Sequence, residues 1–324
     1  MKTHFTKLAL SALLFAFVSC SSDDDAATPA DQPSIAELAA SNPNLSILVD
    51  ALNRTNLTGT LNQNGALTVF APTNDAFTAF LSTQGFANLD AVPTATLREI
   101  LLNHVINGEF MSNQLSTGYV KTLGKGSASP ENTLSMFVRV SNNVVLNGGV
   151  ANGGATVITA DVDARNGVVH VVNGVIGLPT VTSHALANPD FSVLIQALTR
   201  NDQPDFAGIL SGNANAPFTV FAPTNAAFTN LLGELSLSDL ADVPQATLEK
   251  TLKYHVVTGA NVLSTSLSEG MNVNTFANEA FTIGLSGGAK ITDANNRVSN
   301  ITATDVQAEN GVVHVVDKVL LPTL

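Results

Sequence analysis

The protein has 324 residues, of which 45% are hydrophobic and 12% are charged. This length and apolar content predict about two domains with packed cores rather than a disordered chain. The 26 acidic residues outnumber the 14 basic ones, for a formal net charge of −12. Such a chain lacks the basic face that binds a phosphate backbone, so we predict no nucleic-acid partner. Its single cysteine excludes an intrachain disulfide and a multi-cysteine metal site.

The N-terminus carries the features of an export signal. Lys2 and Lys7 precede an apolar run at 8–18, which is shorter than the roughly 20 residues that a membrane-spanning helix needs. The run leads to Ser19-Cys20, an order that resembles the lipobox of bacterial lipoproteins, in which the cysteine is acylated after cleavage. We predict a signal peptide over residues 1–19 and lipidation of Cys20 as the only attachment to a membrane. The alternative is a soluble secreted protein whose cysteine lies near the cleavage site by chance.

Residues 20–33 are predicted to form an acidic and polar tether, because they show no apolar periodicity. Two serines and three aspartates at 21–25 resemble the export signal of surface lipoproteins in the Bacteroidetes group. The resemblance implies an outer-membrane lipoprotein that is exposed on the cell surface. The alternative is an ordinary acidic spacer.

Helix signals come first in the region that follows. Ser34 and Glu37 have the spacing of a capping box, and Asn42-Pro43 is typical of the start of a second helix. A buried strand is predicted at 68–70, then a short helix capped by Thr73 or Asn74, then a helix that ends near His104. Short apolar runs between Asn and Gly turns predict strands at 136–140, 144–146, 155–162 and 168–172. Helices before strands indicate an α+β domain.

Two blocks of sequence occur twice, in the same order. The first reads TVFAPTNDAF at 68–77 and TVFAPTNAAF at 219–228, and the second reads NGVVHVV at 166–172 and again at 310–316. Each copy is long enough for its own core, which predicts two domains at 34–180 and 181–324. The blocks lie seven residues closer together in the second copy, a loss that we assign to a loop.

These blocks, together with the intervening helix that ends in Asn103-His104 or Tyr254-His255, resemble the fasciclin-like domain. The resemblance covers both copies almost end to end. It implies two tandem α+β domains, each a β-sandwich or wedge with helices packed around it. It also implies adhesion or matrix association outside the cell, without catalysis or a cofactor.

A Tyr-His pair is linked with receptor-mediated adhesion in animal members of that family. Tyr254-His255 matches the pair, whereas Asn103-His104 has Asn in place of Tyr. The resemblance therefore implies a candidate binding site at Tyr254, His255, Asn103 and His104. Because Tyr254 lies about 100° around its helix from His255, we predict that its side chain is nearer to solvent.

Four histidines recur in pairs and are the natural candidates for chemistry. His104 and His255 continue apolar rows of a helix, and His170 and His314 lie within Val-Val-His-Val-Val. Both patterns are typical of buried side chains. Neither pair has the close spacing of a zinc site, so we predict buried core histidines and neither a catalytic nor a metal site.

Three other motifs are rejected as sites. The sequence 284–288 has the GxSxG form of a hydrolase nucleophile turn, but strand-like runs flank it on both sides, which indicates a hairpin turn. The segment 118–127 lacks the spacing of a phosphate-binding loop. The segment 293–296 has too few oxygen ligands for calcium and is typical of a turn.

The sequence thus predicts a non-enzymatic surface protein that adheres to extracellular matrix, other cells or envelope components. Its partner would be an extracellular protein or polysaccharide, and no cofactor is expected. The alternative function is a surface lipoprotein that binds a polysaccharide or a small ligand.

Overall fold

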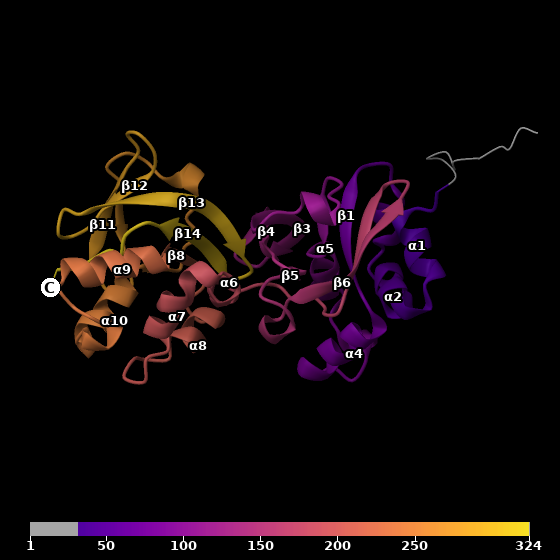
Figure 1. Ribbon diagram of the computed structural model, residues 1–324, viewed down its shortest axis with the longest axis horizontal. Coiled ribbons are helices and arrows are strands. Elements are labelled where there is room, and N and C mark those ends of the chain that lie inside the picture. The colour runs from indigo at the N-terminus through magenta and orange to yellow at the C-terminus, as the bar shows by residue number, and fades with distance from the viewer. Residues whose placement is uncertain (1–31, 324) are drawn as a thin grey trace, which may run out of the picture. The chain divides into compact units, whose positions relative to one another are not determined.

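A computed structural model describes residues 32–323 of the protein (Figure 1). The residues from Pro33 onward form one compact unit. The predicted signal peptide, the lipidation site Cys20 and all but the end of the predicted tether lie outside the described residues.

The first domain begins with helices and ends with strands. Its helices are α1 (Ile35–Ser41), η1 (Pro43–Leu45), α2 (Ser46–Arg54), α3 (Thr58–Asn62), α4 (Asn74–Thr83), η2 (Leu89–Ala91), α5 (Thr94–Leu102), η3 (Ser112–Gln114) and η4 (Val150–Asn152). Its strands are β1 (Leu67–Pro72), β2 (Val105–Asn107), β3 (Gly118–Gly126), β4 (Ser129–Val140), β5 (Val144–Leu146), β6 (Ala155–Ala164) and β7 (Gly167–Val172). The seven strands close into a barrel in chain order, because β7 pairs with β1 in parallel.

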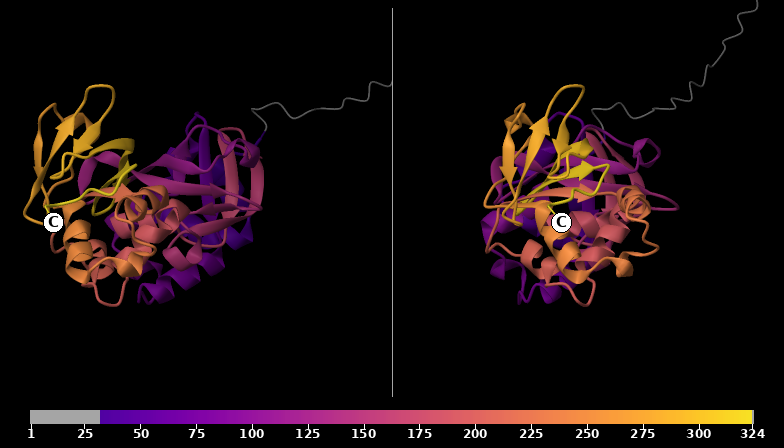
Figure 2. Two further views of the ribbon diagram at one scale, coloured as in Figure 1. Left: turned by 60° about the vertical axis from the view of Figure 1, so that its left-hand side comes forward. Right: turned by 90° about the vertical axis from the view of Figure 1, so that its left-hand side faces the viewer.

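The second domain repeats this order of elements, except that its residues 181–323 contain no equivalent of η4. Its helices are α6 (Val181–Ala187), η5 (Pro189–Phe191), α7 (Ser192–Leu198), α8 (Phe206–Ser211), α9 (Asn225–Glu234), η6 (Leu240–Asp242), α10 (Gln245–Tyr254) and η7 (Ser264–Ser266). Its strands are β8 (Phe218–Pro223), β9 (Val256–Thr258), β10 (Asn272–Asn274), β11 (Ala280–Gly284), β12 (Lys290–Thr292), β13 (Val298–Ala308) and β14 (Gly311–Val316). They form one sheet in the order β10-β11-β12-β13-β14-β8-β9. The α+β architecture predicted from the sequence is confirmed, and in Figure 2 the yellow strands of this domain lie above its orange helices.

The predicted helix starts are confirmed at the level of single hydrogen bonds. The Ser34 hydroxyl accepts from the Glu37 amide and the Glu37 carboxylate accepts from the Ser34 amide, which is a complete capping box. Thr73 caps α4, and its hydroxyl accepts from the amide of Ala76. Asn42-Pro43 opens the 3-10 turn η1, which leads directly into α2.

The two repeated blocks are neighbouring strands. β1 and β7 pair in parallel in the first domain, as β8 and β14 do in the second. This register places Phe70 opposite His170 and Phe221 opposite His314, and the rings stack with centroids 5.6 Å and 5.3 Å apart. The most similar parts of the two copies therefore form the parallel centre of each sheet.

Each domain has two hydrophobic clusters, one on each face of this central pair. In the second domain, one cluster joins the sheet to the helices α6 to α10 and the other fills the space enclosed by the curved sheet. Phe221 and Phe281 belong to the enclosed cluster, with ring centroids 5.0 Å apart. The first domain is built in the same way, with Phe70 in the enclosed cluster. A side chain that points away from the helices can therefore still be buried.

The seven-residue difference between the copies lies in strands rather than in a loop, which corrects the sequence prediction. β3 and β4 contain 9 and 12 residues, whereas β10 and β11 contain 3 and 5. The long β3–β4 hairpin ends at the second domain, where the Ala128 amide donates to the Glu309 carbonyl at 2.7 Å. The extra residues thus make a contact with the following domain. Strand β3 itself was not among the strands predicted from the sequence.

Candidate functional site

His104 and His255 fasten the end of a helix to the segment that follows the last strand. His255 directly follows α10, and His104 follows α5 after one intervening residue, Asn103. Nδ1 of His104 donates to the Ile100 carbonyl at 2.7 Å, and Nε2 accepts from the Ile176 amide at 2.9 Å. His255 makes the same two contacts, at 2.8 Å with Thr251 and 2.9 Å with Leu320.

His170 and His314 fasten a bulge in the neighbouring strand. The amides of Asp161 and Asp305 donate to Nδ1 of His170 and His314, at 3.2 Å and 3.4 Å. Both aspartates have positive φ, near 60°, and their carboxylates accept from Ser112 or Ser264. Nε2 donates to the carbonyl of Phe110 at 2.9 Å in the first copy, and to that of Val262 at 2.8 Å in the second.

All eight ring nitrogens of these paired histidines therefore have a partner. The prediction that they are buried is confirmed, because their exposed fractions are 3% or less. Burial lowers the pKa of His104 and His255 to about 4, against the weaker opposing effect of a carbonyl acceptor. A ring whose two nitrogens are both bonded has no free lone pair for a metal ion or a substrate proton. Within residues 32–323, no cluster of three or more His, Cys, Asp or Glu side chains could hold a metal ion.

The predicted position of Tyr254 near solvent is wrong. Its side chain is 0% exposed, and its hydroxyl donates to the Ala280 carbonyl at 2.9 Å. The side of α10 that bears Tyr254 faces the enclosed cluster, where the ring packs against Phe281. Burial raises the pKa of Tyr254 to about 12.

The equivalent position in the first domain is buried as well. Asn103 is 0% exposed, donates to the Gly177 carbonyl at 2.9 Å and accepts from the Thr122 hydroxyl at 3.0 Å. None of the four predicted binding residues Tyr254, His255, Asn103 and His104 reaches the surface in this structure. All four side chains are hydrogen-bonded within the fold.

Sequence reasoning missed the asparagine at the start of NGVVHVV. Asn310 is fully buried, accepts from the Val181 amide at 3.0 Å, and donates to the carbonyls of Leu210 and Gly212. Asn166 makes the same set of bonds in the first domain. The glycine that follows is required for space, because a Cβ at Gly311 would lie 2.2 Å from the Phe218 carbonyl oxygen. The asparagine, the glycine and the histidine of this block therefore each have a place in the fold.

The rejected motifs are confirmed as ordinary structure. Residues 284–288 form the turn between β11 and β12 rather than a strand-to-helix turn. Residues 118–126 are β3. The Asp293 carboxylate accepts from the amides of Asn295 and Arg297, which makes 293–296 an Asx turn.

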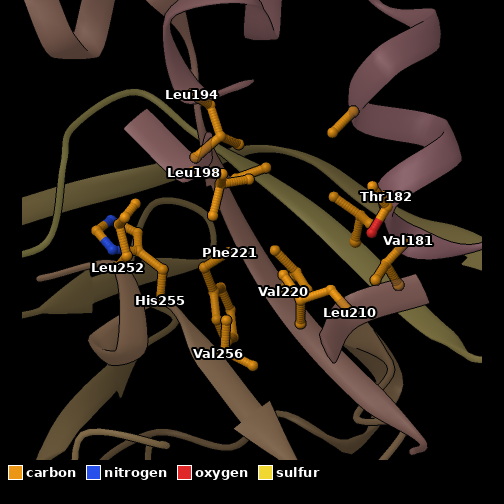
Figure 3. A pocket seen from close by; sticks show the side chains of 13 residues that line it. Val181, Thr182, Leu194, Leu198, Leu210, Val220, Phe221, Leu252, His255 and Val256 are labelled. Carbon is orange, nitrogen blue, oxygen red and sulfur yellow. The ribbon is translucent and has the colours of Figure 1, made fainter. Parts of the chain in front are cut away.

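A small apolar cavity lies beside His255, between the sheet and the helices of the second domain (Figure 3). Its volume is about 30 Å³ and its walls are mostly aliphatic, including Val181, Leu194 and Leu210. Thr182 bears the oxygen that is drawn in red in this view, and its buried hydroxyl has no hydrogen-bond partner. The cavity is too small for anything larger than one or two waters and is a packing gap rather than a binding site.

The larger hollows lie at the surface of the first domain. Two of them adjoin each other beside α4, with volumes of about 300 Å³ and 90 Å³, and share Phe80, Gln84 and Gly153. Glu309 of the second domain also lines the larger hollow. None of the four predicted binding residues lines this cleft.

No helix in the described part of the chain is long and apolar enough to cross a membrane.

Comparison with known proteins agrees with this architecture. Human periostin is 28% identical over 80% of this chain, although the matched part is 28% of periostin itself. Protein sll1483 of Synechocystis is 38% identical over 50% of this chain and 79% of its own length. Among solved structures, a FAS1 domain pair from the insect cell adhesion molecule fasciclin I matches with a TM-score of 0.55 and 20% identity. That match covers 87% of this chain and 98% of the other.

The family model for the fasciclin domain matches two successive parts of the chain, residues 43–179 and 189–322. Each match contains one TVFAPTN block, one NGVVHVV block and the helix between them. The chain therefore belongs to the fasciclin domain family and carries two fasciclin domains in tandem.

Proposed function

We propose that this protein is a non-enzymatic adhesion protein that binds extracellular matrix, other cells or envelope components through its fasciclin domains. The observation that carries the proposal is the state of the four repeated histidines: both nitrogens of each ring are bonded within the fold, so the histidines stabilise a scaffold. The insect cell adhesion molecule with a similar domain pair supports the same reading. The partner is an extracellular protein or polysaccharide.

The adhesive role is tested with the region from Pro33 onward, which contains both domains. Beads coated with this protein should capture intact cells or matrix-coated surfaces above the level of beads coated with serum albumin. Soluble protein should compete with the beads. Equal capture by both kinds of bead would contradict the proposal.

We also propose that the protein is displayed on the outer face of an outer membrane through a lipid on Cys20. The order of Lys2, the apolar run 8–18 and Ser19-Cys20 supports this, together with the acidic serine-rich start of the tether. Labelled palmitate should be incorporated into the wild-type protein and not into Cys20→Ala. Surface display is tested separately, because protease added to whole cells should remove the domains of the wild-type protein.

The alternative function, binding of a polysaccharide or small ligand, is supported by the cleft beside α4. The larger part of this cleft has a volume of about 300 Å³, which is at the lower end of the range that ligand pockets occupy. Apolar and polar side chains line it together.

A further inference from the structure

The two copies differ at the cleft beside α4, because the turn η4 in its wall has no equivalent between β12 and β13. α4 ends at Thr83 and its equivalent α9 ends at Glu234. The two strands opposite the helix ends also correspond: the Thr156 amide donates to Asn173 Oδ1, as the Asn300 amide donates to Asp317 Oδ1. Counting back three residues from Thr156 and Asn300, into the loop before each strand, Gly153 of the first domain corresponds to Arg297 of the second.

In the second domain this position is closed by an ion pair. Arg297 reaches across to Glu234 at the end of α9, with Nη2 2.6 Å from the carboxylate. The same guanidinium donates to the Val319 carbonyl at 2.8 Å and to Asp293 at 3.2 Å. The Arg297 side chain therefore occupies the space between the helix end and the loop.

In the first domain the equivalent residues leave this space open. Thr83 and Gly153 replace the ion pair, and Gly174 stands where the second domain has Lys318. The opposite wall is the glycine-rich loop 147–154, in which Gly148, Gly149 and Gly153 have positive φ. A Cβ on Gly153 would meet no atom within 4 Å, so the loop faces an open space there.

The side chains around the cleft fit a neutral sugar. Phe80, Phe86 and the exposed Val150 supply apolar walls, against which the C–H face of a sugar ring can pack. The side chains of Gln84 and Glu309 make no hydrogen bond to any described residue. The Gln84 amide can donate to or accept from a sugar hydroxyl, and the Glu309 carboxylate can accept from one. No Lys or Arg lines the cleft, so no cationic side chain is present there to pair with an anionic ligand.

An extended peptide fits less well. Peptides that bind along a protein backbone need a row of free amides and carbonyls. In this loop the amides of Gly149, Asn152, Gly153 and Gly154 already donate to carbonyls of the same segment. Recognition in the cleft has to come from side chains.

We propose that the cleft between α4 and the loop 147–154 of the first domain binds a short segment of an uncharged polysaccharide. The proposal rests on the binding function proposed above and gives it a ligand class. The second domain, whose equivalent cleft is closed by Arg297 and Glu234, does not take part.

The test uses both domains and a panel of uncharged oligosaccharides: cello-, xylo-, manno- and maltotetraose. Binding is measured by saturation-transfer NMR and titration calorimetry. At least one tetrasaccharide should bind, and Gln84→Leu should weaken it about tenfold, the effect of losing one or two uncharged hydrogen bonds. Phe86→Leu should weaken it as well. Leu occurs at the equivalent positions 235 and 237, so both variants should fold.

Leu235→Gln, the reverse change in the second domain, is the matched control and should leave binding unchanged. The proposal is overturned if none of the four sugars binds, if Gln84→Leu and Leu235→Gln behave alike, or if a tetragalacturonate binds more tightly than the neutral sugars. If coated beads adhere but no sugar binds, the sugar-binding proposal is contradicted and the adhesive role is not. Sugar binding without adhesion of the beads would instead contradict the proposed adhesive role.

Discussion

At the scale of single residues, the histidines and asparagines that recur in both copies serve the structure. The four repeated histidines, Asn166 and Asn310 are buried and hydrogen-bonded to backbone groups that lie far away in the chain. Buried polar groups are stable only when they are bonded, so each of these contacts specifies one arrangement of strands and helices. The chemistry that histidine could supply elsewhere is used here to hold the fold.

Buried neutral histidines make stability depend on pH. The pKa values of His104, His184 and His255 are lowered to about 4 by burial. As the pH falls from about 6.5 toward 4, the unfolded chain binds protons that the folded protein does not, so the free energy of unfolding decreases. Each group contributes a loss of roughly 3 kcal/mol over that interval. Urea denaturation at pH 7, 6 and 5 should show the decrease.

A variant with one buried histidine fewer is the control for this effect. His184→Gln should reduce the uptake of protons on unfolding by about one at pH 5. Carboxylates such as Glu279, whose pKa is lowered to about 2, lose their contribution only below the range of this experiment. An unfolding free energy that stays constant from pH 7 to pH 5 would show that these histidines are not buried as neutral rings.

Tyr254 provides a second test at the residue scale. Tyr254→Phe removes the donor to the Ala280 carbonyl and should lower the free energy of unfolding by about 1 kcal/mol. Because the side chain is buried, bead adhesion should not change. Adhesion lost at unchanged stability would mean that Tyr254 contacts the partner directly.

At the scale of elements, the two copies show how small differences change packing. Ile35 at the start of α1 and Val181 at the start of α6 are equivalent, because their amides donate to Asn166 and Asn310. Val181 lacks one methylene and lines the cavity of about 30 Å³. A gap of this kind removes dispersion contacts from the surrounding side chains.

Filling the gap should stabilise the second domain. We expect Val181→Ile to raise the free energy of unfolding by about 0.5–1.5 kcal/mol, the range that an Ile-to-Val change costs in a core. The matched variant Ile35→Val should lower it by a similar amount. Calorimetry on both variants checks this, and a lower melting temperature for Val181→Ile would mean that the cavity cannot accept the extra carbon.

At the scale of the whole molecule, the domains are joined by more than the chain that connects them. The tip of the β3–β4 hairpin contacts the turn between β13 and β14, and Ser135 accepts from the Gln307 amide at 3.0 Å. Lys121 donates to the Asp305 carbonyl at 2.6 Å. These contacts should couple the unfolding of one domain to that of the other.

A larger residue at the hairpin tip should break this coupling. A Cβ at Gly126 would lie 2.4 Å from Glu309 Cα, so Gly126→Val has to displace backbone. We expect the single calorimetric transition of the wild-type protein to separate into two. Gly59→Ala, where a Cβ meets no atom within 4 Å, is the control and should keep one transition. Two transitions in the wild type would mean that the hairpin contact is too weak to couple the domains.

The sequence by itself determined the domain repeat, the α+β class, the helix caps and the burial of the repeated histidines. These features depend on local hydrogen bonds and on periodicity, which are visible in neighbouring residues. It could not place Tyr254, because a position on a helix says which way a side chain points and not what covers that side. Nor could it find the cleft beside α4. That site depends on whether Arg297 or Gly153 faces a helix end 63 or 70 residues earlier in the chain, a relation that only the tertiary structure decides.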